Sequence, residues 1–332
     1  MNTFLNNPVF ICGHRKAGTT MLINLFDNTK GAITYPDDSG FFYKYFPRYA
    51  SHKYSDEEKI KRLHETLIKD KLTEVIANID CDTVSRNDLY KKQKIFSNYI
   101  KNYDKKGFTY KDILIHFMDS FKKSFYESSE ASIWIEKTTT TEVYALELSK
   151  VFPNAKFIHI IRDPRDNWGS LLSGWDKKYN NYNDSKERLL QSLIDRGRLG
   201  MELAKSNASL IGKDRYKIIK FEDLTKNPEY WMSDLAEFAG IPVDKSLFTP
   251  TTFGFTWGGN NFDGIKMAKP TSVNVSKWKS RITEHDAKVI EFHFHDIMRF
   301  FDYNPYYSKE ESQLSASEHY KWYNFSTMFS DK

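Results

Sequence analysis

Two glycines and two cations follow an apolar run near the N-terminus. The run covers residues 9–12, and the next six residues, 13–18, include Arg15 and Lys16. Thr19 then opens a stretch with helical apolar spacing, so the segment predicts a strand, a loop and a helix. Such a loop turns its backbone N–H groups toward one point, and the helix dipole adds positive potential there. The segment therefore predicts a binding site for an anion of the phosphate type.

The spacing of Gly13 and Gly18 fits the first part of the nucleotide-binding pattern G-x-x-x-x-G-K-[ST]. Residue 19 is a threonine, however, where that pattern has the lysine that reaches the terminal phosphates. The lysine here is Lys16, inside the loop, where it could stabilise charge that develops on a leaving group. A phosphate-loop kinase is a second hypothesis for function. A tight turn without function is the structural alternative.

Two adjacent carboxylates, Asp37 and Asp38, follow an expected strand at residues 31–35. They are candidates for a catalytic base beside the aromatic cluster at residues 41–46. Equally, Asp at such a place forms turns or caps a helix. The aromatic side chains could stack on a sugar or an aromatic acceptor, or belong to the core.

A second anion site is predicted farther along the chain. The clearest strand, residues 156–161, ends directly at Arg162, and Ser170 follows two turns into the next helix. Ligands of open parallel sheets bind outside the carboxyl ends of the strands. The planar donor fork of Arg162 and the hydroxyl of Ser170 suit a second phosphate. Another expected strand, residues 133–137, ends in the cation Lys137.

Strands and helices alternate along the chain, which predicts an α/β fold with a central parallel sheet flanked by helices, as one domain over residues 1–332. A lysine-rich helical insertion is expected at about residues 51–130, where it either shapes an acceptor pocket or decorates the core. Residues 184–208 predict one long helix. The irregular segment at about 249–277 is expected to cover a ligand.

Composition limits the class of protein. The net charge of +5 is not gathered into long basic runs, so nucleic-acid binding is not indicated. The sequence has no run of 18 consecutive apolar residues, so no transmembrane segment is predicted. Two cysteines, Cys12 and Cys81, give neither a disulfide framework nor metal-binding spacing. Together with the absence of a signal-like N-terminus, these features predict a cytoplasmic protein.

Three separated segments carry motifs that match one family. They are Arg-Lys-Ala-Gly-Thr-Thr at 15–20, Phe-Pro-Asn-Ala-Lys-Phe at 152–157 before Arg162 and Ser170, and Phe-Glu-Asp-Leu at 221–224 before Asn227-Pro228. Together they resemble the sulfotransferases that use 3′-phosphoadenosine 5′-phosphosulfate (PAPS). Lys269-Pro270 followed by Ser276-Lys277-Trp278 is similar to the tyrosylprotein sulfotransferase branch and its bacterial relatives.

The resemblance implies a phosphate-loop-like α/β fold, and it assigns roles to individual residues. Arg162 and Ser170 would bind the 3′-phosphate of PAPS, and Lys277 would contact the nucleotide. Lys137 matches a position that lies near the transferred sulfonate in relatives. The 5′-phosphosulfate loop would be formed by Arg15, Lys16, Ala17, Gly18, Thr19 and Thr20.

The resemblance also implies a carboxylate base. Relatives carry a glutamate in a turn after the second strand, and Asp38 aligns with the second acid of that turn, with Asp37 in reserve. The expected reaction is in-line transfer of the sulfonate to a hydroxyl or amine of a glycan, a lipid-linked sugar or a small metabolite, and it requires no metal. The third hypothesis is a nucleotide-binding protein of this fold without turnover, which the shorter acids would favour.

Overall fold

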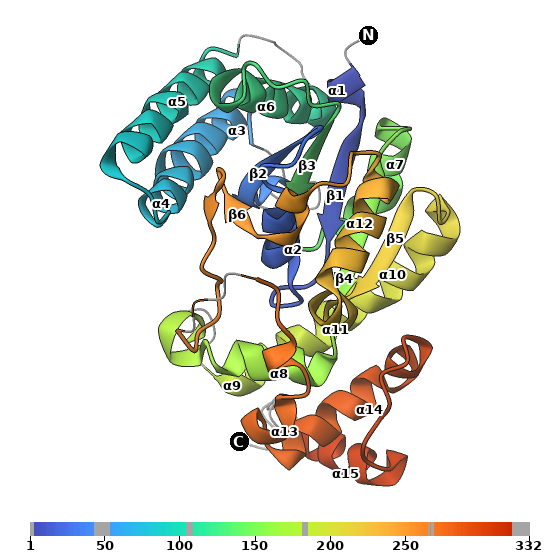
Figure 1. Ribbon diagram of the computed structural model, residues 1–332. Coiled ribbons are helices and arrows are strands. Elements are labelled where there is room, and N and C mark those ends of the chain that lie inside the picture. The colour runs from blue at the N-terminus through green and yellow to red at the C-terminus, as the bar shows by residue number, and fades with distance from the viewer. Residues whose placement is uncertain are drawn as a thin grey trace.

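A parallel sheet forms the centre of the computed structural model, which describes residues 3–42, 54–103, 109–180, 185–264, 266 and 269–320. Five strands lie in the order β2-β3-β1-β4-β5 (Figure 1). All four pairings are parallel, as expected for an α/β fold. The strands are β1 (Pro8–Cys12), β2 (Ala32–Asp38), β3 (Ile133–Lys137), β4 (Lys156–Ile161) and β5 (Tyr216–Lys220).

Both faces of the sheet are covered, which explains why its strands read as continuous apolar runs. In β1, Val9 and Ile11 pack with α2 (Thr19–Phe26) and α12 (Pro228–Ala239). Phe10, which points to the opposite face, packs with the helical insertion. The sheet is therefore a fixed base for the side chains at its carboxyl edge.

The insertion contains four α-helices and one π-helix, η2, in the part of the chain that the structure describes. Its helix α6 begins with a capping box between Thr109 and Asp112. Phe96 of α5 packs against Phe117 of α6, and Phe117 packs against Tyr35 of β2, so the insertion shares the core of the sheet. The helices are α3 (Asp56–Arg62), η2 (Leu63–Lys71), α4 (Leu72–Ala77), α5 (Thr83–Lys101) and α6 (Tyr110–Phe125).

The long helix expected at residues 184–208 is present as one continuous helical run with a π-helical segment in its middle. It consists of α9 (Lys186–Ser192), the π-helical η5 (Leu193–Gly197) and α10 (Arg198–Ile211). Farther along the chain lies α14 (Glu284–Phe300). A further helix, α15 (Lys309–Tyr320), was not predicted, because its apolar residues have little helical periodicity.

No helix in the described ranges is both long and apolar enough to cross a membrane. The remaining elements are short. These elements are α1 (Thr3–Asn6), η3 (Thr141–Tyr144), α7 (Ala145–Val151), α8 (Pro164–Leu172), η4 (Trp175–Tyr179), α11 (Phe221–Lys226), η6 (Lys245–Phe248), β6 (Thr251–Thr252), β7 (Phe255–Thr256), η7 (Ser272–Asn274) and α13 (Trp278–Arg281).

Candidate functional site

The loop between β1 and α2 is held in a conformation that ordinary side chains rarely adopt. Lys16 has a φ of 65° and Gly18 a φ of 110°. A Cβ atom on Gly18 would lie 2.6 Å from the ring of Phe221, so only glycine fits there. At the start of the loop, the N–H of Gly13 donates to Oε2 of Glu142 at 3.1 Å. The loop is thus fixed at both ends.

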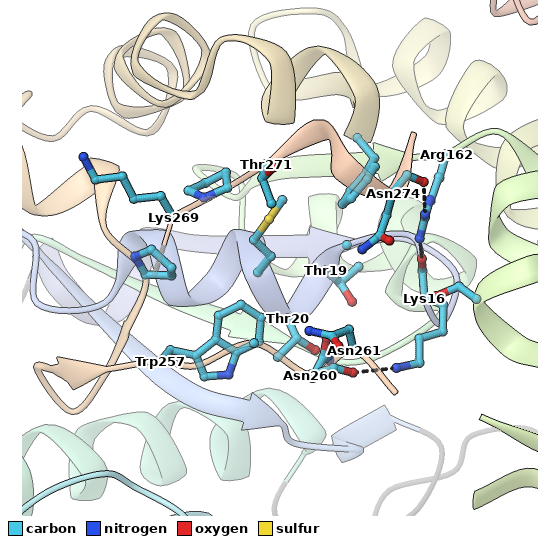
Figure 2. A pocket seen from close by; sticks show the side chains of 17 residues that line it. Lys16, Thr19, Thr20, Arg162, Trp257, Asn260, Asn261, Lys269, Thr271 and Asn274 are labelled. Atoms are coloured by element: carbon cyan, nitrogen blue, oxygen red, sulfur yellow. Dashed lines mark hydrogen bonds between the residues drawn. The ribbon is translucent and has the colours of Figure 1, made fainter. Parts of the chain in front are cut away.

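A cleft of about 740 Å³, including the part open to solvent, lies over this loop. The start of α2, Arg162 at the end of β4, Ser170 in the last turn of α8, and residues between 250 and 261 and between 269 and 274 form its walls (Figure 2). It is lined by Lys16, Gly18, Thr19, Thr20, Met21, Arg162, Ser170, Phe221, Pro250, Trp257, Gly259, Asn260, Asn261, Lys269, Pro270, Thr271 and Asn274.

Arg162 joins the loop to the irregular segment at about 249–277, which is called the covering segment below. Its Nη1 donates to the carbonyl of Lys16 at 3.0 Å, and its Nη2 donates to the carbonyl of Asn274 at 3.1 Å, as Figure 2 shows. The guanidinium also lies 4.4 Å from the centre of the Phe221 ring. Because Arg162 is only 7% exposed, it is a rigid cation on the cleft wall. Ser170 of α8 lines the same cleft, so the two residues predicted to bind a second phosphate lie in one cleft.

Lys16 points into the cleft and contacts the covering segment. Its Nζ donates to the carbonyl of Asn260 at 3.0 Å and lies 3.9 Å from the centre of the Phe262 ring. Burial, together with the charges of Lys178, Arg162 and Lys137, lowers the pKa of Lys16 to about 7. Burial is the larger cause, and the three neighbouring cations add positive potential that a bound anion would offset.

Lys137, Thr20 and Asp37 meet at the carboxyl edge of the sheet. The Nζ of Lys137 donates to the Thr20 hydroxyl at 3.0 Å and lies 3.9 Å from Oδ1 of Asp37. Lys71 of η2 lies 3.3 Å from Oδ2 of the same carboxylate. Burial opposes ionisation of Asp37, but Lys137 and Lys71 outweigh it and hold its pKa below the ordinary value. Asp37 is therefore a carboxylate between two ammonium groups.

Asp38 has a structural role in this arrangement. Its Oδ2 accepts hydrogen bonds from the N–H and the hydroxyl of Thr139, and its Oδ1 accepts from the N–H of Gly40 at 2.9 Å. The two bonds from Thr139 tie the end of β2 to the second residue after β3. Neither acid caps a helix, since both lie within β2. Of the two acids, Asp37 is the one whose side chain lies beside Lys137 and Lys71.

Three residues expected to bind the nucleotide do not line the cleft. Arg15 points away and donates to the hydroxyl of Ser192 at 2.7 Å. Ala17 is buried under the loop. Lys277 lies at the start of α13, where Asp166 accepts the backbone N–H groups of the residues before and after it. In this structure that motif anchors the covering segment to α8, while Lys277 itself stands outside the cleft lining.

Sequence reasoning missed several residues of the site. Lys71 was one lysine among many in a lysine-rich insertion, and no local pattern distinguishes it. Glu142 gave no signal either, although it is buried, holds the Gly13 N–H and has a pKa raised to about 7 by burial. Trp257 lines the cleft and is the one tryptophan of the segment 249–277, but no motif singles it out.

The aromatic cluster expected beside the base is part of the core where it is described. Phe41 and Phe42 are 0% and 4% exposed and pack on each other, so they do not form an acceptor wall. The residues at 43, 45 and 46 lie outside the described ranges. Within the described ranges, no group of three or more His, Cys, Asp or Glu residues is placed to hold a metal ion.

Part of the chain is similar in sequence to known proteins. A segment of 151 residues is 26% identical to the protein-tyrosine sulfotransferase of Drosophila melanogaster, and covers 42% of this chain and 28% of that protein. A segment of 158 residues is 27% identical to protein-tyrosine sulfotransferase 1 of Danio rerio, and covers 43% and 41%. The chain thus matches less than half the length of these relatives.

Solved structures agree in fold over nearly the whole chain. The sulfotransferase domain of the Synechococcus PCC 7002 olefin synthase superposes with a TM-score of 0.57 and 15% identity, covering 90% of this chain and 95% of that one. The sulfotransferase domain of the curacin biosynthetic pathway gives 0.57 and 14%, covering 89% and 97%. The sulfotransferase family model matches residues 8–245, more than half of the sequence. The phosphate-loop-like fold and the resemblance are thereby confirmed, and this chain belongs to the sulfotransferase family.

Proposed function

We propose that this protein transfers the sulfonate group of PAPS to a hydroxyl or amine of an acceptor molecule. The observation that carries this proposal is the charge of the cleft lining. Three cations, Lys16, Arg162 and Lys269, line it, and no carboxylate does so among the described residues. PAPS carries a 3′-phosphate and a 5′-phosphosulfate, so two separated groups of donors match its chemistry better than the single site of a nucleoside triphosphate.

The donors divide into two groups along the cleft. Lys16 and the hydroxyls of Thr19 and Thr20 would bind the 5′-phosphosulfate, with the loop amides. Arg162 and Ser170 would bind the 3′-phosphate. Of these donors, Nε of Arg162 has no hydrogen-bond partner within the described structure, which is consistent with a missing acceptor.

In the proposed reaction, Asp37 accepts the proton of the acceptor hydroxyl while the acceptor oxygen forms a bond to sulfur. The bond between sulfur and the bridging oxygen breaks, and 3′,5′-ADP leaves. Lys16 would stabilise the negative charge that grows on the departing phosphate, and Lys137, which touches both Thr20 and Asp37, would stabilise the sulfonate oxygens. The position of Asp37 beside Lys137 supports this assignment of the base.

The acceptor is proposed by class. A glycan, a lipid-linked sugar or a small hydroxylated metabolite would present the required nucleophile. The two curated relatives are named for protein tyrosine, so a tyrosine peptide belongs in the same screen. The helical insertion, which supplies Lys71 beside Asp37, is placed to contact whichever acceptor enters.

The test combines binding and transfer. We expect 3′,5′-ADP to raise the melting temperature, and labelled sulfonate to pass from PAPS to at least one acceptor class. Lys16→Ala should abolish transfer, whereas Lys30→Ala, an exposed lysine outside the cleft, should not change it. Absence of a thermal shift at millimolar 3′,5′-ADP would contradict the proposal, and Mg²⁺-dependent consumption of ATP would favour a kinase instead.

A further inference from the structure

The carboxylate of Asp37 is held from the side of the helical insertion as well as from the sheet. Lys71 lies 3.3 Å from Oδ2 of Asp37, and it also donates to the backbone carbonyl of Asp38. Lys137 lies 3.9 Å from the other oxygen, Oδ1. Each carboxylate oxygen thus has one ammonium group, and Lys71 additionally holds the strand that carries Asp37.

The backbone around Lys71 is well supported. Lys71 is the last residue of the nine-residue π-helix η2, whose residues Leu63, Leu67 and Ile68 are fully buried. Gln93 of α5 donates to the carbonyl of Ile68 at 2.5 Å. π-Helices are rare and frequently mark functional sites. The insertion is therefore anchored in the core and presents one lysine to the edge of the sheet.

The two lysines differ in their access to solvent. The side chain of Lys137 is 4% exposed, whereas that of Lys71 is 27% exposed and that of Asp37 is 31% exposed. Lys137 faces the loop and Thr20, on the side of the nucleotide cleft. Lys71 approaches Asp37 from the helical insertion.

We propose that Lys71 is a positioning residue for the catalytic base, supplied by the helical insertion; this rests on the proposed function, in which Asp37 accepts the acceptor proton. Lys71 keeps Asp37 ionised and fixes the plane of its carboxylate before the acceptor binds. It acts through Asp37 and need not touch the transferred group. The insertion would then be part of the catalytic machinery rather than decoration.

Few other charged groups face Asp37 in the described structure. Asp38, its neighbour on β2, is turned toward Thr139 and Gly40. Glu136 of β3 is buried and bonded to Ser39 and Thr138. Lys16 is near Lys137, and the charge of Lys137 helps to lower the pKa of Lys16. Lys71 is therefore the more exposed of the two ammonium partners, and its removal should change the titration of Asp37.

The first experiment measures that titration without requiring turnover. The protein is labelled with ¹³C at aspartate carboxyls, and Asp37→Asn assigns the signal. Because an adjacent cation favours the carboxylate, Lys71→Met should raise the pKa of Asp37. Lys71→Arg should restore it, and Lys69→Met, an exposed lysine of the same helix, should leave it unchanged.

The second experiment measures transfer of labelled sulfonate to the acceptor that the screen identifies. Lys71→Met should lower kcat by about tenfold and move the acidic limb of its pH profile upward, with unchanged affinity for 3′,5′-ADP. Rescue by Lys71→Arg separates this role from general destabilisation. If Lys71→Met has the wild-type kcat, pH profile and Asp37 titration, the proposal is wrong. If the wild type neither transfers sulfonate nor binds 3′,5′-ADP, the proposed function itself fails, and with it any catalytic meaning of the pair.

Discussion

Binding of 3′,5′-ADP should make the protein take up a proton, and Lys16 should be the group that takes it. The pKa of Lys16 is lowered to about 7 by burial and then by the neighbouring cations Lys178, Arg162 and Lys137. A bound phosphate would reverse the effect of those charges, because an opposite charge stabilises the ammonium form. Lys16 should therefore be protonated more fully in the complex than in the free protein.

The size of this effect follows from the pKa. At pH 8, one unit above a pKa of about 7, about nine tenths of Lys16 is neutral in the free protein, so full protonation in the complex takes up about 0.9 proton. Phosphate groups of the nucleotide have second pKa values near 6 and are already ionised at pH 8. The nucleotide therefore adds little to the proton balance under these conditions.

Calorimetric titrations in Tris and in HEPES, which differ in ionisation enthalpy, measure the uptake per mole bound. The wild type should show close to one proton at pH 8 and much less at pH 6, where Lys16 is already charged. Lys16→Met should show almost none at pH 8. Equal uptake in the wild type and in Lys16→Met would refute the reasoning, since the proton would then bind elsewhere.

Replacing Gly18 by alanine should lower the unfolding free energy by about 2 kcal/mol, because its φ is 110° and a Cβ would clash with Phe221; urea denaturation measures this, and an unchanged midpoint would contradict it. Glu142→Gln should flatten the pH dependence of stability. Burial raises the pKa of Glu142 from 4.5 to about 7, so the folded protein binds more protons in that window and its unfolding free energy falls as pH rises. Glu142→Ala, which leaves the Gly13 N–H without its acceptor, should cost about 1–3 kcal/mol; a neutral effect would show that this bond does not support the loop. Arg162→Lys should weaken 3′,5′-ADP binding at least about tenfold but hardly affect adenosine 5′-monophosphate, since only the former has a 3′-phosphate; equal losses for both nucleotides would argue against a 3′-phosphate site at Arg162.

Much of the fold could be predicted because it is encoded in short stretches. The strand of residues 156–161 is bounded as expected, and Asn227 and Gly240 flank α12 as its start and stop signals indicate. The π-helical segment after Ser192 was not predictable, since it depends on packing rather than on local propensity. Helix α15 was missed for want of an apolar stripe.

The candidate site divides in the same way. Arg162 and Ser170 lie together in the cleft because one strand and one helix carry both, so their spacing alone brings them to the carboxyl edge. Arg15 is next to Lys16 in sequence, yet it turns toward Ser192, on α9. Which side chains of a loop enter a site depends on backbone dihedral angles that sequence does not specify.

The sequence by itself determined the strand, loop and helix around Lys16, the delivery of Arg162 to the sheet edge, and hence an anion site of the sulfotransferase type. Only the tertiary structure decided that Asp37 is the acid that contacts Lys137 and Lys71. The register between β2 and β3 shifts between Thr34 and Asp38, so the simple alternation of a strand cannot assign Asp37 and Asp38 to their faces. The partners of Asp37 come from β3 and from the insertion, and Lys16 meets a carbonyl 244 residues away. Such contacts exist only after the distant segments have packed, which is why no local pattern contains them.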